Sequence, residues 1–324
     1  MTHAIRFHTT GGPEVLQWEP VTLAALAANE ARIRQHACGL NFIDIYHRTG
    51  LYPVPLPSGI GLEGAGVVEA VGSGVAHLKP GDRVAYAGGP LGGYSEARLI
   101  PADRLVKLPD AIGFDTAAGM MLKGLTAAYL LRRTYRVQAG DAVLIHAAAG
   151  AVGLIACQWA KALGATVIGT ASSEAKAELA RANGCDHVIL YNREAFAPRV
   201  REITGGEGVA VVYDGVGKDT FAGSIDSLRP LGMMVAFGNA SGPVPPVDPL
   251  LLSQKGSLFL TRPTLMHYTA KRADLEALAG ELMDVVASGR VKIEVNQTFP
   301  LREAARAQVA LEARQTTGST VLLT

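Results

Sequence analysis

Two glycines near the middle of the chain, Gly150 and Gly153, have the spacing of a phosphate-binding turn. They follow the apolar run 142–147 and open a second apolar run. A strand, a glycine turn and a helix in this order bring backbone N–H groups and the positive end of a helix dipole to one point. A bare Gly-x-x-Gly is weak evidence, and Ala148 stands at the first glycine position of the full motif. Its context nevertheless predicts a turn that holds the pyrophosphate of a dinucleotide.

The residues after the next apolar run indicate which dinucleotide is bound. Chains that prefer NAD usually carry Asp or Glu about 20 residues past the turn, where the carboxylate binds ribose hydroxyls. Here Ser172 and Ser173 occupy that place, and Lys176 follows one turn into the expected helix. Hydroxyl and ammonium groups favour a 2′-phosphate, which a carboxylate would repel. The pattern therefore indicates NADPH, with Glu174 expected to face solvent or cap the helix. The alternative is that the serines only cap this helix and Lys176 is a solvated charge.

The sequence gives little support for catalysis by a serine or cysteine nucleophile. There is no Gly-x-Ser-x-Gly elbow, and we expect His146 to be a buried, hydrogen-bonded ring rather than an acid–base group. The three cysteines, Cys38, Cys157 and Cys185, are widely separated and lack paired metal spacing. This usage predicts no disulfide framework and fits a reducing cytosol.

The elements that must position these residues change character along the chain. Residues 1–120 contain short apolar runs between turns, a pattern typical of an antiparallel barrel or sandwich. From 123 to 260 strands and helices alternate, which predicts a parallel sheet with helices on both faces. We expect strands at 142–147, 165–170, 187–190, 209–213 and 233–237, and helices at 151–163 and 174–183. Helices are also expected at 272–287 and 301–315, and a last strand at 319–324 that returns to the first domain.

Composition excludes several classes of protein. The chain has 324 residues, 18% of them charged, and a formal net charge of +1. Bulk electrostatics therefore predicts neither a nucleic-acid nor a membrane surface. The uncharged window 142–160 is interrupted by glycines and is better explained by a strand entering a buried helix than by a membrane span. The first eight residues lack the apolar core of a signal peptide, so we expect a cytoplasmic location.

Several motifs outside the glycine turn resemble one known family. They are Asn41-Phe-Ile-Asp44 with Tyr46, Gly50-Leu-Tyr-Pro53, Lys123-Gly-Leu-Thr126, Phe237-Gly-Asn239, Gln254-Lys-Gly-Ser257 and Thr261-Arg-Pro263. Over essentially the whole chain the sequence resembles the zinc-free medium-chain dehydrogenase/reductases, in particular the NADPH:quinone oxidoreductases related to zeta-crystallin. The resemblance implies an α/β protein with a GroES-like, mostly-β catalytic domain at 1–122 and 262–324. A Rossmann domain, with a doubly wound parallel sheet that binds NADPH, is implied at 123–261.

The resemblance also bears on metal binding. Zinc-dependent relatives bind a catalytic zinc through Cys, a His within Gly-His-Glu and a further Cys. The corresponding residues here are Asn41, Leu62 and, near the third position, Lys123, which are not a plausible tetrahedral ligand set. We therefore expect no metal. Without a Lewis acid, alcohol oxidation is not expected, and the acceptor of a hydride must already be electrophilic, as a quinone or a conjugated enone is.

Site residues follow from the resemblance, motif by motif. Asn41, Tyr46 and Tyr52 are implied in catalysis, with either tyrosine as a donor to the substrate oxygen. The implied NADPH-binding residues are Asn41, Tyr46, Lys123, Thr126, Gly150, Ala151, Val152, Gly153, Ser172, Ser173, Lys176, Tyr191, Phe237, Gly238, Asn239 and Arg262. The alternatives are that the tyrosines only pack at the rim, that Asn41 forms a turn and that Phe237 belongs to the core.

The leading hypothesis is an NADPH-dependent quinone reductase. The alternatives are an NADPH-dependent reductase of enones or enoyl thioesters, and a non-catalytic NADPH-binding protein with a crystallin-like or RNA-binding role. We also expect a homodimer, because the apolar run 257–261 is typical of an edge strand that two copies can pair. The physiological acceptor, and one- versus two-electron reduction, stay open at this level.

Overall fold

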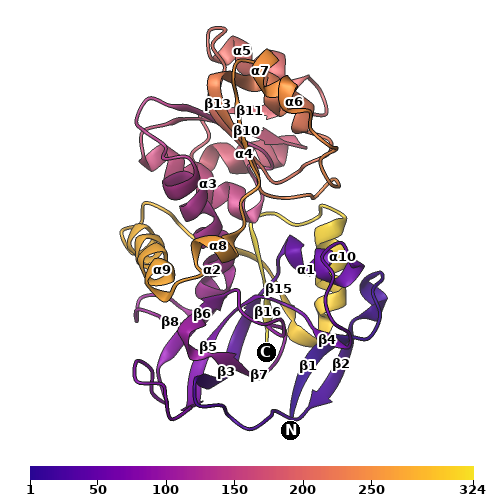
Figure 1. Cartoon of the computed structure of the whole chain (residues 1–324), viewed down its shortest axis with the longest axis vertical. Coiled ribbons are helices and arrows are strands. Elements are labelled where there is room, and N and C mark those ends of the chain that lie inside the picture. Colours follow the sequence, from indigo (N-terminus) through magenta and orange to yellow (C-terminus); the bar gives the residue numbers. More distant parts are fainter. The chain divides into compact units, whose positions relative to one another are not determined.

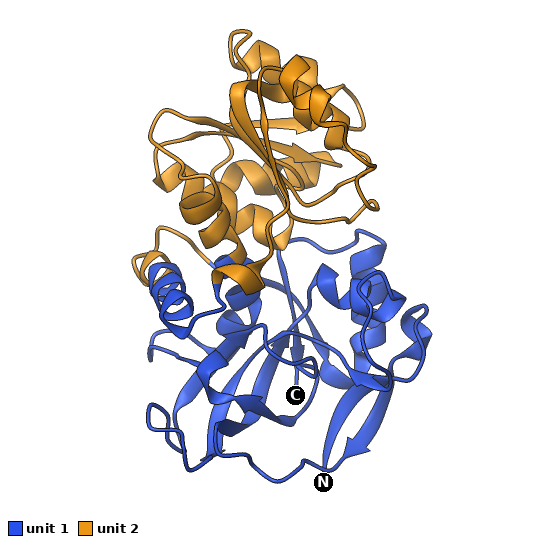
Figure 2. Cartoon of the chain, in the orientation of Figure 1, with its two compact units in different colours: residues 1–125, 269–283, 293–324 blue, residues 126–268, 284–292 orange.

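The chain forms two compact units. A computed structural model describes all residues from 1 to 324 (Figure 1), and Figure 2 colours the two units separately. Unit 1 consists of Met1–Leu125, Thr269–Met283 and Ile293–Thr324, and unit 2 of Thr126–Tyr268 and Asp284–Lys292. These bounds differ from the predicted domain bounds chiefly at 262–268 and 284–292, which fall in unit 2.

Unit 1 is built mainly from β-strands. They are β1 (Thr2–Phe7), β2 (Gln17–Val21), β3 (Glu30–Gly39), β4 (Ser58–Gly59), β5 (Glu63–Val71), β6 (Arg83–Ala87), β7 (Ala97–Pro101), β8 (Val106–Lys107), β15 (Val295–Pro300) and β16 (Ser319–Leu323). One sheet has the order β2-β1-β4, and the other has the order β15-β16-β3-β5-β6-β8, with β7 also paired to β3. Apart from the parallel pair β15 and β16, neighbouring strands are antiparallel. The mostly-β character expected of this region is confirmed.

The pleat of β3 explains why this segment is a strand. Ala31 and Ile33 are fully buried, whereas the alternating Arg32 and Arg34 are exposed. Successive side chains of a strand point to opposite faces, so one face of β3 enters the core. There Ile33 packs in a cluster with residues of β5, β6 and β7. The predicted return of the last strand is confirmed, because β16 lies between β15 and β3.

Four α-helices contribute to unit 1. They are α1 (Phe42–Thr49), α2 (Phe114–Tyr129), α9 (Arg272–Ala287) and α10 (Ala304–Glu312), with short 3₁₀ turns η1 (Pro13–Val15), η2 (Ala102–Arg104) and η4 (Leu301–Glu303). The bounds of α9 match the predicted helix. The helix predicted at 301–315 is instead the turn η4 followed by the shorter α10.

Unit 2 contains one parallel sheet with helices in the connections. Its strands are β9 (Ala142–Ile145), β10 (Thr166–Ala171), β11 (His187–Leu190), β12 (Val209–Asp214), β13 (Leu228–Ala236) and β14 (Phe259–Thr261). Its helices are α3 (Ala151–Ala162), α4 (Glu174–Ala182), α5 (Phe196–Ile203), α6 (Phe221–Ser227), α7 (Pro249–Gln254), α8 (Leu265–Tyr268) and the π-helical turn η3 (Leu130–Thr134). The strand order is β11-β10-β9-β12-β13-β14, in which the direction of winding reverses between β9 and β12. This is the doubly wound order of Rossmann folds.

Backbone conformation decides where several of these elements end. Gly164 and Gly184 have φ of 86° and 99° and follow α3 and α4, as the sequence predicts. β9 stops at Ile145, short of the predicted end at 147, because the backbone turns at Ala147 with φ of 51°. β14 begins at Phe259 rather than 257 because Ser257 has φ of 56°, which a strand does not accommodate.

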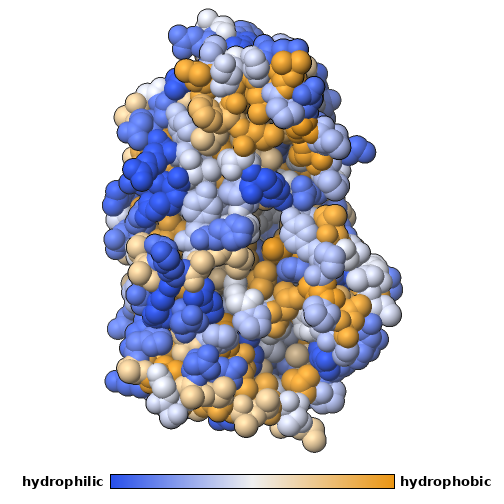
Figure 3. Space-filling view, viewed as in Figure 1, coloured by the Kyte–Doolittle hydropathy of each residue, from blue (hydrophilic) through white to orange (hydrophobic).

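The outer edge of the unit 2 sheet carries exposed apolar side chains. β14 pairs only with β13, and Phe259 is 56% exposed. Leu231 and Leu250 are also exposed, and Figure 3 shows apolar side chains gathered over the part of unit 2 near α6 and α7. None of the helices is both long enough and apolar enough to cross a membrane.

Candidate active site

The turn between β9 and α3 is shaped to receive an anion. α3 begins after Gly150, no side chain caps its N-terminus, and its first intrahelical bond runs from Leu154 N to Gly150 O. The earlier N–H groups of a helix have no partner within it, so those of 151–153 can bind ligand oxygens. A Cβ on Gly153 would clash with the Ala147 carbonyl oxygen and lie 2.7 Å from that of Ala148. The turn therefore fits a pyrophosphate, and glycine at 153 permits its tight geometry.

The alanine at the first glycine position of the motif, Ala148, packs against a glycine of the neighbouring strand. Ala148 is fully buried and its N–H donates to Thr170 O at 3.0 Å. A Cβ on Gly169 of β10 would lie 2.7 Å from the Cβ of Ala148. Glycine in the neighbouring strand thus leaves the space that the alanine side chain occupies.

The ends of β10 and β11 bring a second group of predicted residues together. Because these strands are parallel neighbours, Ser172 and Tyr191 leave the sheet at the same edge. Asn192 Nδ2 donates to Ser172 O at 3.0 Å, which ties the two loops. Ser173 Oγ accepts from Lys176 N at 3.4 Å, so this serine caps α4. The cap of α4 therefore uses the hydroxyl of Ser173 and not that of Ser172.

The one acidic residue in this group, Glu174, is accompanied by positive charge. Its carboxylate lies 3.2 Å from Arg181 Nη1 and 3.7 Å from Arg193 Nη1. All three side chains are at least 46% exposed, so each pair is weak. Together the two guanidinium groups still offset the negative charge that would otherwise oppose a phosphate at this edge.

Further predicted residues follow the ends of β13 and β14. Phe237 N donates to Asp214 O at 2.8 Å, and Phe237 is half-buried rather than a core residue. A Cβ on Gly238 would lie 2.9 Å from the Cα of Gly215, so these two loops approach closely. Arg262 directly follows β14. Since all strands of this sheet are parallel, these loops lie at the same carboxyl edge as the glycine turn, where Rossmann folds bind their ligands. Asn239 follows Gly238 in the loop after β13, and Thr126 lies on α2 and is 7% exposed.

His146 is buried and hydrogen-bonded, as predicted. Its Nδ1 lies 3.0 Å from Thr170 Oγ1 and its Nε2 lies 2.9 Å from Ser224 Oγ. Ser224 in turn donates to Asp214 Oδ2 at 3.1 Å. Burial lowers the pKa of His146, so the neutral ring is favoured. This network ties β9, β10 and β12 to α6.

In unit 1, Glu63 gathers two of the predicted residues around one carboxylate. Asn41 Nδ2 donates to Glu63 Oε2 at 2.8 Å, and Lys123 Nζ lies 2.5 Å from the same oxygen. Leu122 N donates to Glu63 Oε1 at 2.7 Å. The carboxylate is 0% exposed and the Lys123 side chain 3%. These groups belong to the N-cap of α1, to β5 and to α2, and they meet around a buried ion pair.

The two predicted tyrosines lie beside each other on and after α1. Their ring centroids are 5.1 Å apart in an edge-on arrangement, and Tyr52 N donates to Tyr46 O at 3.0 Å. Tyr46 is 8% exposed and Tyr52 is half-buried. Asn41 is the N-cap of this helix and forms a capping box with Asp44, so the turn-forming alternative describes its backbone. Its side chain additionally contacts Glu63.

One carboxyl group on α1 lies in unusual surroundings. Asp44 is fully buried and accepts from Asn41 N at 2.9 Å and Tyr94 Oη at 2.7 Å through Oδ2, while Oδ1 has no partner. Burial raises the pKa of Asp44 to about 7. The side chain that fixes the start of α1 therefore titrates near neutral pH.

The residues at the expected zinc-ligand positions do not form a metal site. Asn41 and Lys123 meet at Glu63, and Leu62 is buried with an apolar side chain. No three His, Cys, Asp or Glu side chains gather in a way that would hold a metal ion. The positive charge beside Glu63 is the ammonium group of Lys123.

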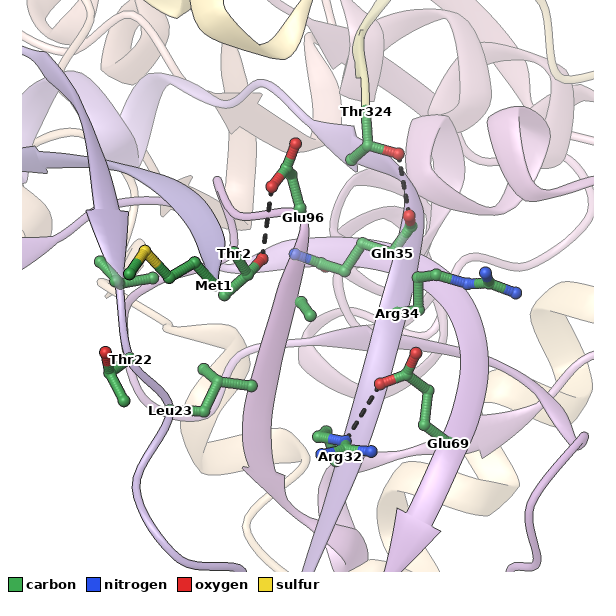
Figure 4. A pocket seen from close by; sticks show the side chains of 12 residues that line it. Met1, Thr2, Thr22, Leu23, Arg32, Arg34, Gln35, Glu69, Glu96 and Thr324 are labelled. Atoms are coloured by element: carbon green, nitrogen blue, oxygen red, sulfur yellow. Dashed lines mark hydrogen bonds and ion pairs between the residues drawn. The ribbon is translucent and has the colours of Figure 1, made fainter.

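A surface groove of about 690 Å³ lies elsewhere on unit 1 (Figure 4). Its charged lining residues are largely paired with each other or their neighbours, with Arg32 Nε 3.0 Å from Glu69 and Glu96 accepting from His3 N at 2.8 Å. Gln35, at its floor, donates to Gly93 O and Ser95 O. None of the predicted site residues lines this groove.

Two cysteines that are far apart in sequence meet in unit 2. The sulfur atoms of Cys157 on α3 and Cys185 before β11 are 3.3 Å apart, and both are buried free thiols. The hydrogen bond with Cys185, together with burial, raises the pKa of the Cys157 thiol. Cys38 is a buried free thiol in unit 1, where burial raises its pKa to about 12. Its burial is typical of a cysteine that packs as a small apolar residue.

Comparison with known proteins gives the family. Residues 27–110 match the alcohol dehydrogenase GroES-like domain, and residues 151–283 match the zinc-binding dehydrogenase family. A quinone oxidoreductase of Pseudomonas aeruginosa is 56% identical over 324 residues, which are 100% of both chains. The chain belongs to the quinone oxidoreductase family of the medium-chain dehydrogenase/reductases. The predicted fold class, a GroES-like part and a Rossmann sheet, is thereby confirmed.

Two further relatives illustrate the range of the family. The crystal structure of Escherichia coli quinone oxidoreductase complexed with NADPH has a TM-score of 0.98 and 51% identity, over 99% of this chain and 100% of that one. A 2-haloacrylate reductase of a Burkholderia species is 49% identical over 331 residues, which cover 100% of this chain and 99% of the relative.

Sequence reasoning missed Glu63, on which the unit 1 residues converge. Its signal was present, because Gly61-Leu-Glu63 keeps the glutamate of the Gly-His-Glu motif while the histidine is replaced. The structure adds that a Cβ on Gly39 would clash with Glu63 Oε2. Only the tertiary structure links these positions to Lys123.

Proposed function

We propose that this protein is an NADPH-dependent quinone oxidoreductase that transfers hydride from NADPH to a quinone without bound zinc. The uncapped N-terminus of α3 at the reversal point of a Rossmann sheet is the observation that carries the proposal. Full-length relatives named quinone oxidoreductases support it, as does a relative that was solved with NADPH. The chain lacks the side chains that would bind a zinc ion in related dehydrogenases.

The residues of unit 2 divide by the part of NADPH they are proposed to bind. Gly150, Ala151, Val152 and Gly153 hold the pyrophosphate, and Ser172, Ser173, Lys176 and Tyr191 hold the 2′-phosphate. Thr126, Phe237, Gly238 and Asn239 serve the nicotinamide half, and Arg262 approaches the cofactor phosphates. When bound, NADPH supplies a hydride, and the chain contributes orientation and hydrogen bonds.

Three residues of unit 1 are proposed to act at the reacting end. Asn41 and Tyr46 contact the nicotinamide, and Tyr46 or Tyr52 donates to the substrate oxygen. The packing of the two rings supports a shared role, because moving one displaces the other. Lys123 belongs to the predicted cofactor-binding set, but we propose that it contributes little to the affinity for NADPH, since its ammonium is already paired with Glu63.

The decisive experiment measures NADPH oxidation with phenanthrenequinone and, in parallel, with a conjugated enone and a 2-haloacrylate. We expect the largest kcat/KM with the quinone. A larger kcat/KM with the enone or haloacrylate would assign the protein to carbon–carbon double-bond reduction. NADPH binding with no turnover of any acceptor would leave the non-catalytic role and overturn both enzymatic readings.

We also propose that the protein is a homodimer joined through β14. The strand is an unpaired edge with exposed Phe259 and Leu260, and a second copy can pair with it to extend the sheet. Light scattering should give twice the chain mass. Leu260→Lys should then yield a monomer, whereas a wild-type monomer would contradict the proposal.

The remaining proposals concern domains and location. We propose that residues 123–261 form the nucleotide-binding domain and that 1–122 with 262–324 form the catalytic domain. The compact units support this division, although their bounds differ by short segments. A cytoplasmic location is proposed because three buried free thiols suit a reducing compartment.

A further inference from the structure

One oppositely charged pair in unit 1 is almost wholly removed from water. Glu63 is 0% exposed and the Lys123 side chain is 3% exposed, with Nζ 2.5 Å from Oε2. Burying two charges is costly, and apolar side chains of similar size often give equal or greater stability. The pair therefore calls for an explanation other than stability.

The surrounding backbone is arranged to hold the carboxylate in place. A Cβ on Gly39 would clash with Glu63 Oε2 and with Ala118 O, so only glycine leaves room for this side chain. Leu122 N and Asn41 Nδ2 donate to its two oxygens at 2.7 and 2.8 Å. With Lys123, three donors from two segments, α2 and the N-cap of α1, fix the carboxylate.

The ammonium of Lys123 is less completely bonded than its partner. An ammonium carries three N–H donors, and Glu63 Oε2 is the acceptor that Lys123 contacts. Buried donors without an acceptor raise the free energy of the folded protein. A ligand oxygen placed beside Nζ would remove this cost.

The net charge of Glu63 and Lys123 together indicates which kind of ligand oxygen Lys123 can bind. A phosphate is poorly suited, because Glu63 offsets the charge of Lys123 and repels a nearby dianion. A carbonyl oxygen that is neutral at first and gains negative charge during reduction is better suited. Donors fixed in advance stabilise such developing charge most effectively.

We propose, building on the proposed quinone reduction, that Lys123 is a catalytic residue and Glu63 its positioning residue. Lys123 donates a hydrogen bond to a quinone oxygen. As the quinone gains the hydride with its electron pair, it becomes the hydroquinone monoanion. A proton then passes from Nζ to that oxygen and gives the hydroquinone, and the neutral amine regains a proton from water.

The test combines turnover with a binding assay that needs no reaction. In Lys123→Met, kcat with phenanthrenequinone should fall about 100-fold or more, as for loss of an oxyanion donor. The Kd for NADPH should change less than about 3-fold, because the lost interaction belongs to the reacting acceptor. In the second assay 4-nitrophenol serves as the probe, and its phenolate absorbance reports the bound anion. Wild-type protein should favour the bound phenolate, and Lys123→Met should lose this preference.

Further variants keep the test decisive. Because removing Lys123 alone leaves a buried carboxylate, the double variant Glu63→Gln with Lys123→Met removes both charges and keeps the volume. It should fold and remain as slow as Lys123→Met. Glu63→Gln alone should lower kcat and weaken phenolate binding while Lys123 is still present. Lys107→Met is the matched control, since Lys107 pairs with Asp82 at 2.9 Å but is 55% exposed.

The outcomes separate this proposal from the proposed function. Equal phenolate binding by wild type and Lys123→Met, no phenolate binding by wild type, or wild-type kcat in a folded double variant would each overturn the role of Lys123. If wild-type protein reduces no quinone, the proposed function fails, and the 4-nitrophenol comparison still decides whether Lys123 binds an oxyanion.

Discussion

The carboxylate of Glu174 is paired with the guanidinium of Arg181, with Nη1 3.2 Å from Oε1, on the first helix after β10. Arg193 approaches the other oxygen of the same carboxylate at 3.7 Å. The acidic residue that would repel a 2′-phosphate is thus compensated by two arginines. We therefore expect the charges near Glu174 to determine the preference for NADPH over NADH. Substitutions of these charged residues can test this by their effect on the Kd of each dinucleotide.

Lys176→Ala should weaken NADPH binding about tenfold or more, since a hydrogen bond to a charged group contributes about 1.5–3 kcal/mol. NADH lacks the 2′-phosphate, so its Kd should stay nearly constant. Fluorescence titration with both dinucleotides checks this. Equal weakening of both would refute the assignment of Lys176 to the phosphate.

Arg193→Glu should weaken NADPH binding several-fold, because it places a second carboxylate beside Glu174. The effect should shrink at high salt, which screens exposed charges. Arg199→Glu is the matched control, with the same change of charge at an arginine that pairs with Glu202. If both variants lose affinity equally, net charge rather than local charge governs binding.

Gly153→Ala should disrupt the turn at the start of α3. The added methyl group would clash with Ala147 O and lie 2.7 Å from Ala148 O, which predicts a loss of about 1–3 kcal/mol in stability and weaker NADPH binding. Gly280→Ala in α9 is the control, since a Cβ there meets nothing within 4 Å. That variant should be slightly stabilised, because alanine favours helices. Thermal unfolding with and without NADPH measures both, and a Gly153→Ala protein that unfolds and binds like wild type would contradict the prediction.

Asp44 should make stability depend on pH. Burial raises its pKa from 3.8 to about 7, so the folded protein binds a proton more tightly than the unfolded chain. The stabilisation from this proton is complete below about pH 4 and is lost as the pH rises through 7. Relative to wild type, Asp44→Asn should therefore gain about 3 kcal/mol between pH 5 and 8. Denaturant unfolding at both values checks this, with the exposed Asp219→Asn as control; a constant difference for Asp44→Asn would show that Asp44 does not titrate in this range.

Prolonged chelation should leave quinone reduction unchanged. The residues at the zinc-ligand positions include an amide, an alkyl group and an ammonium, and the ammonium of Lys123 would repel a cation near Glu63. Activity after dialysis against a strong chelator should match activity after dialysis without it. Loss of activity that zinc restores would contradict the zinc-free proposal.

Local patterns in the sequence were sufficient to predict most of unit 2. The glycine turn, the α4 cap at Ser173 and the glycines that end α3 and α4 depend on neighbours within a few residues. Strand and helix order followed from the same local signals. The ends of β9 and β14 were less accurate, because positive φ at Ala147 and Ser257 leaves no clear trace in residue type.

Long-range contacts could not be predicted in this way. Glu63 and Lys123 are 60 residues apart, and Cys157 and Cys185 are 28 apart, yet each pair is in direct contact. Sequence reasoning singled out Lys123 and the three cysteines. The residues that Lys123 and the cysteines contact depend on how sheets and helices pack, which local patterns do not reveal. The compensation of Glu174 by Arg193 likewise appears only when β11 is placed beside β10.

The position of β16 has a consequence for how the protein is made. This strand lies inside the larger sheet of unit 1, between β15 and β3, yet it follows the whole of unit 2 in the chain. During synthesis β3 emerges from the ribosome early, and β7 can pair with its residues 30–34, but its residues 37–39 gain their partner on that side only when β16 arrives. Domains generally fold as they are produced. The parallel sheet of unit 2 can therefore assemble on the nascent chain before the larger sheet of unit 1 gains its last strand.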